Sequence, residues 1–287
     1  MQFWVSITDD DWFVHLSRLQ PDEVNHWQHS PKPLRLMDPG MPYLFKLRAP
    51  NDYVVGGGWF AHFSTLPCFL AWQAFGEKNG VKSLQDLIQE TSDNRQNRGS
   101  ELGCNLILQP FFLPEEDWIP IPENWSPNIH GLTYDTDEQH GSELWQAVEE
   151  KLIKTGASQP AQSQPGPGTF HIQVTDAYHR RCAVTNESSL PALAVSHIKP
   201  THKQGPHHTS NGILLRNDIQ HLFVNGYVTL DPDLRFIVSE QLRDQYADSN
   251  EYTRYHGARL QNLPDNPADQ PNRDYIRWHR EECFERI

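Results

Sequence analysis

The residues most able to do chemistry lie in two short runs, Val195–Pro200 and Asn211–Phe223. His197 ends a predicted strand, and Asn211 follows after a short loop. A neutral histidine can take a proton from water, and one divalent cation can stabilise the charge that grows on a scissile phosphate and its leaving oxygen. The two runs therefore predict a compact one-metal site that hydrolyses a phosphodiester bond.

The chain of 287 residues is long enough for two domains, each with its own core. A hydrophobic content of 37% is typical of a soluble globular protein. The sequence lacks an apolar run of about 18 residues, so no membrane span is expected. It also begins without a basic segment or a cleavage site, which favours a cytoplasmic location. The four cysteines form no CxxC pair and are expected to be free thiols: Cys68, Cys104, Cys182 and Cys283.

The net charge of −13 argues against a general nucleic-acid-binding protein, but the charge is unevenly distributed. Residues 1–169 hold 11 of the 24 Lys and Arg and 22 of the 37 Asp and Glu, a net charge of −11. Residues 170–287 carry only −2, and within 179–221 basic side chains outnumber acidic ones. A polyanion is therefore expected to approach this part of the chain locally, with strongly salt-dependent binding.

Residues 155–169 contain no charge and no large apolar side chain, and they are rich in Pro, Gly, Ser and Gln. This composition is typical of a flexible linker. The sequence therefore predicts a domain at 1–154, a linker at 155–169 and a second domain at 170–287. The overall class is α+β.

Strands and helices alternate irregularly in the first domain, which favours a mixed β-barrel with added helices. Gly56–Gly58 interrupts a strand pattern and indicates a bulge or a close approach of two backbones. The expected strands are 3–8, 43–48, 53–63 and 103–113, and the expected helices are 10–19, 67–75, 83–91 and 141–154.

Residues 1–154 resemble the PUA-like superfamily, in particular EVE-type domains fused to nucleases. The resemblance rests on Trp4–Asp9 with Trp12, Asn25–Trp27, Pro39–Lys46, Gly56–Phe60, Ala71–Gly76 and Asn79–Gly80. It implies a domain that binds a modified base, often 5-methylcytosine or 5-hydroxymethylcytosine, flipped into a pocket with aromatic walls.

Unstacking a base costs a few kcal/mol, and each aromatic face that stacks on it returns about 1–3 kcal/mol. The aromatic candidates are Trp12, Trp27, Trp59 and Phe60, because they lie beside polar loops or the glycine bulge. Each of these rings could instead belong to the core. Asp9, Thr8 and Asn25 are the candidates for hydrogen bonds to the polar edge of the base.

The second domain is expected to begin with a helix at 170–179, followed by strands at 181–185 and 190–198. Residues 211–215 and 217–223 are expected to begin the next helix. A hairpin at 227–239 with its turn at Asp231–Asp233 and a final helix at 272–285 complete the domain.

This domain is similar to the HNH endonucleases of bacterial restriction systems, which implies a ββα-metal fold over 170–287. The residues that carry the resemblance are Asp176–Thr185, Ser196–Pro200, Asn211–Arg216, Leu222–Phe223, Gly226–Thr229, Arg235–Ser239, Tyr255–Gly257 and Trp278–His279. It implies that His197 is the general base and that Asn211 holds the loop so that this imidazole points at the phosphate.

The predicted metal ligands depart from the family pattern. The family usually has a metal-ligating His two positions before its Leu-Phe pair, where this chain has Gln220, and His221 follows one position later. A helix turns about 100° per residue, so His221 cannot replace it without a shifted register. An amide oxygen suits a hard cation, so one Mg²⁺ or Mn²⁺ is expected, with Gln220, Ser196 and His221 as candidate ligands. A second departure is Val224, where the family often has Asp.

Lys199, Lys203, Arg216 and His207 are candidates for contacts to DNA phosphates, although each could be an ordinary surface group. His207 could also ligate the metal. His202 and His208 have no assigned role.

The leading hypothesis is a type IV-like, modification-dependent restriction endonuclease that flips 5-methylcytosine or 5-hydroxymethylcytosine out of double-stranded DNA and cuts nearby. One alternative is a non-cleaving reader whose HNH domain is degenerate at Gln220, and another is an RNA-directed HNH nuclease. Cutting both strands needs two active sites, which suggests a homodimer, although nothing in the sequence fixes it.

Overall fold

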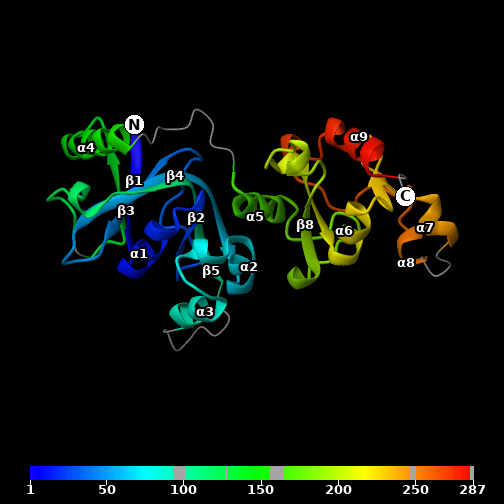
Figure 1. The fold of residues 1–287 in the computed structure, drawn as a ribbon, viewed down its shortest axis with the longest axis horizontal. Coiled ribbons are helices and arrows are strands. Elements are labelled where there is room, and N and C mark those ends of the chain that lie inside the picture. The colour runs from blue at the N-terminus through cyan, green and yellow to red at the C-terminus, as the bar shows by residue number, and fades with distance from the viewer. Residues whose placement is uncertain (93–100, 127, 156–164, 246–249, 285–287) are drawn as a thin grey trace. The chain divides into compact units, whose positions relative to one another are not determined.

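The computed structural model describes residues 1–92, 101–126, 128–155, 165–245 and 250–284. Its contacts divide the chain into two compact units, Met1–Thr169 and Phe170–Ile287, called here the N-terminal and C-terminal units (Figure 1). Both units mix helices and strands, so the prediction of an α+β fold is confirmed. No helix in the described ranges is long and apolar enough to cross a membrane.

The N-terminal unit is built on one seven-stranded mixed sheet. Strand β1 pairs in parallel with β3, and the other strand pairs are antiparallel. The order along the sheet is β2 (Glu23–Gln28), β5 (Leu102–Phe112), β4 (Tyr53–Leu66), β3 (Pro42–Leu47), β1 (Gln2–Thr8) and β7 (Gly131–Asp135), and the short β6 (Ile119–Pro120) pairs with β4.

The glycine run of β4 lies where its two neighbouring strands come very close. The register against β5 shifts between Gly57 and Trp59, which confirms the predicted bulge. A Cβ atom on Gly57 would lie 2.7 Å from the carbonyl oxygen of Tyr43, and one on Gly58 would lie 2.9 Å from that of Leu108. Larger residues would therefore push β3 and β5 away from β4.

Helices cover both faces of this sheet, as Figure 1 shows for α4 and α1. On one face α4 (Gln139–Thr155) packs Trp145 against Phe3 of β1. On the other face α1 (Asp10–Leu19) buries Trp12, Phe13 and Leu16, positions that fall on one side of a helix. Two further helices, α2 (Cys68–Phe75) and α3 (Leu84–Ser92), follow β4.

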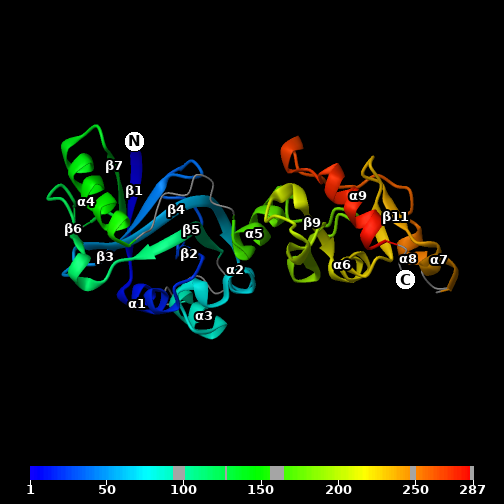
Figure 2. The ribbon, with the colours of Figure 1, turned by 45° about the horizontal axis from the view of Figure 1, so that its top comes forward.

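The C-terminal unit contains a ββα arrangement, labelled in Figures 1 and 2. Its antiparallel strands are β8 (Leu193–His197) and β9 (Gly212–Arg216), and α6 (Asn217–Val224) follows directly and packs against both. The other elements are α5 (Pro167–Ala177), the hairpin of β10 (Val228–Leu230) and β11 (Phe236–Val238), α7 (Glu240–Gln245), α8 (Asn250–Thr253) and α9 (Arg273–Glu282).

Three secondary-structure predictions need correction. Residues 181–185 form turns instead of a strand, because the backbone of Cys182 bonds within the turn, to Glu187 and Asn186, and Ala183 makes only a single bond to Leu214 of the neighbouring strand. The run Gly212–Leu215, predicted as helical, forms β9, because both faces of this apolar segment are buried and its backbone pairs with β8. The last residues of the predicted linker, Pro167–Thr169, are helical in α5, whereas residues 156–164 lie outside the described part of the chain.

Candidate functional site

His197 is the last residue of β8, and the strand pairing brings it opposite Gly212 of β9. A Cβ atom on Gly212 would lie 3.0 Å from the ring of Phe170, so this glycine leaves room for that ring. Phe170 in turn stacks on the imidazole of His197, with ring centroids 4.1 Å apart and planes 17° apart. The imidazole is thus held flat against a buried aromatic ring at the end of its strand.

The imidazole of His197 also contacts a second histidine. Its Nε2 lies 3.0 Å from Nδ1 of His207, which belongs to the loop between β8 and β9. Burial, with a smaller contribution from His207, lowers the pKa of His197 to about 4. His197 is therefore uncharged at neutral pH and has a lone pair that can accept a proton.

Asn211 is fully buried and ties the two ends of that loop together. Its Oδ1 accepts a hydrogen bond from the backbone N–H of Lys199 at 2.9 Å. Its Nδ2 donates to the carbonyl oxygens of Lys199 and Pro206, both also at 2.9 Å. Both amide N–H groups and one lone pair of the amide oxygen bond to the loop, so this side chain links Lys199 to Pro206. The role of Asn211 in orienting His197 for catalysis stays a prediction.

The three predicted metal ligands differ in burial and in their hydrogen bonds. Ser196 precedes His197 in the strand, so its side chain lies on the opposite face. It is buried there, and its hydroxyl donates to the carbonyl oxygen of His197 at 3.3 Å. Gln220 is half-buried on α6, and its side chain makes no hydrogen bond to other described residues. His221 is exposed, with Nε2 3.5 Å from Nδ2 of Asn225.

No group of three or more His, Cys, Asp or Glu side chains converges as a metal site among the residues the structure describes. Among the three predicted ligands, Gln220 offers an amide oxygen, a donor type that suits a hard cation. Mg²⁺ keeps several of its waters and is often held by one or two protein oxygens together with substrate phosphates. The residues present therefore fit a hard, mostly water-bound cation better than a softer metal that prefers imidazole.

The candidate phosphate ligands differ in how free their charges are. The side chains of Lys199 and Lys203 make no ion pair with any described residue. Arg216 donates to both carboxylate oxygens of Asp218 at 2.7 Å, and this pairing raises its pKa further. Its charge is also shared with Glu251 at 3.5 Å, so Arg216 would have to leave two carboxylates to contact a phosphate.

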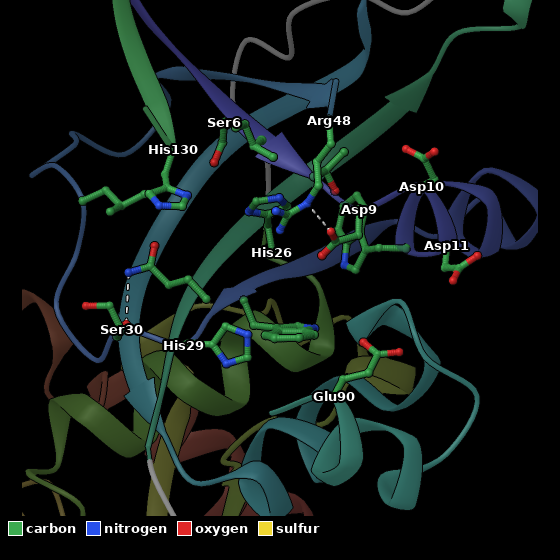
Figure 3. Close-up of a pocket in the computed structure, with 16 residues that line it drawn as sticks. Ser6, Asp9, Asp10, Asp11, His26, His29, Ser30, Arg48, Glu90 and His130 are labelled. Carbon is green, nitrogen blue, oxygen red and sulfur yellow. Dashed lines mark hydrogen bonds and ion pairs between the residues drawn. The ribbon is translucent and has the colours of Figure 1, made fainter. Parts of the chain in front are cut away.

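A cavity of about 930 Å³ opens in the N-terminal unit, beside β1, the start of α1 and β2 (Figure 3). Four of the predicted base-pocket residues line it: Trp12, Trp27, Asp9 and Thr8. The other lining residues are Ser6, Ile7, Asp10, Asp11, His26, Gln28, His29, Ser30, Leu34, Arg48, Glu90 and His130.

The other three predicted pocket residues lie away from this cavity. Trp59 is 4% exposed and packs against Phe111, with ring centroids 6.1 Å apart. Phe60 belongs to the core beneath α1. Asn25 is fully buried, and its Nδ2 donates to Oδ1 of Asn79 at 2.9 Å. None of these three side chains lines the cavity, although Phe60 packs in the same core cluster as Trp12.

Charged groups are distributed unevenly around the cavity. Nε of Arg48 donates to Oδ1 of Asp9 at 2.5 Å, the contact drawn in Figure 3. Burial and the neighbouring carboxylates of Asp9, Asp11 and Asp86 raise the pKa of Glu90. Burial lowers the pKa of His26 to about 4, partly offset by Asp9. Carboxylates thus lie at the α1 and α3 side, and the histidines at the β2 and β7 side (Figure 3).

Sequence reasoning missed Arg48, Glu90, His26, His29 and His130, which complete the cavity. They come from separate elements, and no local spacing connects them. His26 had a usable signal, because it lies within the run Asn25–Trp27 that carries the resemblance. Arg48 directly follows β3, which pairs in parallel with β1. The end of β1 is also where Asp9 lies.

Residues 182–231 match HNH endonucleases. The family model is HNH_2, described as HNH endonuclease, and its match contains β8, β9, α6, His197, Asn211 and Gln220. This part of the chain is therefore similar to a nuclease domain, as the sequence motifs predict. No curated protein matches the sequence.

Two solved structures are similar to parts of the fold. The ASCH protein from Zymomonas mobilis is 11% identical, with a TM-score of 0.36, over 51% of this chain and 93% of its own. A structure titled modification dependent TagI restriction endonuclease is 14% identical, with a TM-score of 0.31, over 93% of this chain and 76% of its own. The EVE type of the N-terminal unit stays a prediction.

Proposed function

We propose that this protein is a type IV-like, modification-dependent restriction endonuclease that acts on double-stranded DNA. In this proposal the C-terminal unit hydrolyses a phosphodiester bond, and the N-terminal unit selects 5-methylcytosine or 5-hydroxymethylcytosine. The observation that carries it is the neutral, stacked His197 at the end of β8, within the segment that matches HNH endonucleases.

His197 takes a proton from the attacking water, and the Asn211 hydrogen bonds keep the loop beside it fixed during that step. Lys199 and Lys203 supply positive charge for the phosphates that flank the cut. Gln220, with water, would hold one Mg²⁺ or Mn²⁺, which stabilises the negative charge of the transition state and of the leaving oxygen. Phe170 excludes water from one face of the imidazole.

In the N-terminal unit, a flipped cytosine would stack on Trp27 and contact Trp12. The carboxylate of Asp9 can accept a hydrogen bond from the exocyclic amine of cytosine, and Arg48 can donate to its ring nitrogen and carbonyl oxygen. Burying one methyl group contributes only about 0.8 kcal/mol, so the preference for a modified base depends on a close apolar fit.

The decisive experiment is digestion of otherwise identical duplexes that carry cytosine, 5-methylcytosine or 5-hydroxymethylcytosine, with Mg²⁺, Mn²⁺ and Ni²⁺ in parallel. We expect cutting of a modified duplex with Mg²⁺ or Mn²⁺, and little cutting of the unmodified one. Equal cutting of all three duplexes would rule out selection by the N-terminal unit. Cutting that persists in His197→Ala would rule out the proposed nuclease site.

A second candidate function is a reader that binds modified DNA without cutting it. Gln220, in place of the histidine usual in the family, favours this alternative, because an amide oxygen binds softer metals such as Zn²⁺ and Ni²⁺ more weakly than an imidazole does. Binding of modified duplex without nicking, in all three metals, would support it. Competition between modified DNA and RNA would test the RNA-directed alternative, and sedimentation with and without DNA would test the proposed homodimer.

A further inference from the structure

The contact between His197 and His207 has a consequence for the chemistry of His197. Each neutral imidazole has one N–H donor and one nitrogen acceptor. The 3.0 Å contact joins Nε2 of His197 to Nδ1 of His207, so one ring donates and the other accepts. Nδ1 of His197 makes no hydrogen bond to any residue that the structure describes.

Only one of the two arrangements leaves His197 able to act on water. If His207 donates, Nε2 of His197 uses its lone pair on His207, and Nδ1 carries the proton. If His197 donates, its Nδ1 keeps a free lone pair. We propose that His207 is a positioning residue: it accepts a hydrogen bond from Nε2–H of His197 and so keeps the Nδ1 lone pair of His197 available to the attacking water. This inference rests on the proposed role of His197 as general base.

The stacking of Phe170 alone cannot keep Nδ1 of His197 available to water. Stacking fixes the plane of the His197 ring at 17° to the phenyl ring, but a ring turned over by 180° would stack nearly as well. The turned ring would carry carbon atoms where Nδ1 and Nε2 now lie. A hydrogen bond from Nε2–H to His207 distinguishes the two orientations, because a carbon atom cannot replace that donor.

The loop around His207 is held by groups other than its own side chain. The carbonyl oxygen of Pro206 accepts a hydrogen bond from Asn211 at 2.9 Å. On the other side, Nδ1 of His208 accepts from the backbone N–H of Ser210 at 3.2 Å. A substitution at His207 is therefore expected to remove its contacts with His197 and Phe170 and leave the loop in place.

The test compares three substitutions with different side-chain geometry. In His207→Asn, Oδ1 occupies nearly the position of Nδ1 and can accept the same hydrogen bond. In His207→Gln the amide lies one carbon further out, and His207→Ala has no acceptor. We expect kcat for nicking of modified duplex to fall about 10- to 100-fold in the Ala and Gln variants. It should stay within about threefold of wild type in the Asn variant, when all variants are compared at saturating DNA so that a lost phosphate contact of His207 does not enter kcat.

The control is His202→Ala, an exposed histidine in the same loop, which should nick as wild type. Thermal unfolding of each variant shows whether the fold is kept. Equal kcat values for the Asn and Ala variants, in folded protein, would overturn the proposal.

A second measurement does not depend on cleavage. Nitrogen-15 spectra of histidine-labelled protein distinguish protonated from unprotonated ring nitrogens. We expect His197 to carry its proton on Nε2 in the wild type and in His207→Asn, and to mix tautomers in His207→Ala. A proton on Nδ1 in the wild type would overturn the proposal. If His197→Ala still cuts DNA while the spectra show the Nε2 proton, the nuclease assignment of His197 fails and the pairing with His207 stands.

Discussion

The two candidate sites are built in opposite ways. The candidate nuclease site takes His197, Asn211 and Gln220 from one continuous stretch, residues 193–224, in which strand, loop, strand and helix follow each other directly. Only the ring of Phe170 comes from outside that stretch. The cavity of the N-terminal unit takes its lining from β1, α1, β2, the segment after β3, α3 and the segment before β7. A local motif can specify the first kind of site, whereas only the completed sheet can assemble the second.

The electrostatics differ as well. At the nuclease site the titratable partner of His197 is another histidine, and two lysines on the adjoining loop have no described ion pair. The cavity has Asp9, Asp10, Asp11 and Glu90 on one side. Carboxylates repel phosphate but can accept hydrogen bonds from a base. We therefore expect phosphates to lie against the C-terminal unit and only a base to enter the cavity.

The largest effect is expected from His197→Ala. Loss of a general base lowers rates by about 10²- to 10⁴-fold, so nicking of modified duplex should fall by at least about 100-fold. Binding of that duplex should be unchanged, because the cavity is untouched. Gel-shift and nicking assays on the same protein measure both. A loss of DNA binding as large as the loss of nicking would contradict the assignment of binding and cleavage to two different sites.

The next largest effect concerns pH and His279. This buried ring stacks on Phe223 and donates to its carbonyl oxygen at 3.0 Å, and Thr229 donates to its other nitrogen at 2.9 Å. Burial lowers its pKa to about 4, below the value of about 6.5 expected in the unfolded chain. The unfolded state therefore binds the proton first, and stability falls as pH drops from about 6.5 towards 4.

The stability lost over this window from His279 alone is up to about 3 kcal/mol. His279→Gln should reduce the pH dependence of the stability of the C-terminal unit without abolishing it, because the pKa of His197 in the same unit is also lowered to about 4. It should leave the pH dependence of the N-terminal unit unchanged, where His26 has a similarly lowered pKa. Amide hydrogen exchange of β10 and of β3 at pH 7 and pH 5, corrected for intrinsic rates, reports the two units separately. A pH dependence of the C-terminal unit that is undiminished in His279→Gln would show that His279 does not contribute to it.

A smaller effect is expected from Trp27→Ala. Loss of one stacking face costs about 1–3 kcal/mol, so the Kd for modified duplex should rise by about 5- to 150-fold. Trp27→Phe should recover most of the affinity. Trp59→Phe is the matched control, because Trp59 is 4% exposed and does not line the cavity. An effect of Trp59→Phe as large as that of Trp27→Ala would place the base elsewhere.

The smallest effect is expected from Lys203→Ala. A phosphate contact without base contacts should weaken binding of modified and unmodified duplex equally, by a few-fold. The slope of log K against log salt should fall by about 0.9. Arg216→Gln should leave that slope nearly unchanged, because Asp218 and Glu251 already pair with Arg216. Titration at several salt concentrations distinguishes the two residues.

The sequence predicts the nuclease unit well for a physical reason. The order of His197, Asn211 and α6 is fixed by two short strands and one loop, so spacing alone indicates the arrangement. The segment Gly212–Leu215 was wrongly predicted as helical, because a short apolar run is equally typical of a buried strand. Its pairing with β8 is what decides between them.

The cavity was predicted only in part. Asp9 and Trp12 lie at the start of α1, where a polar N-terminus meets an amphipathic helix, and this local pattern is visible in sequence. Trp59 and Phe60 carry the same aromatic signal but lie in the core, because both faces of β4 are covered at that point. Which aromatic ring faces a cavity depends on the layers packed over the sheet, and spacing along the chain does not contain that information.

The stacking of Phe170 on His197 sets a limit on how this protein can be shortened. The match to HNH endonucleases begins at Cys182, twelve residues after Phe170. A fragment cut at that boundary would retain His197, Asn211 and Gln220 but lose the ring that covers one face of the imidazole. The space above Gly212 would open at the same time. The smallest piece of this chain that keeps the environment of His197 must therefore include α5.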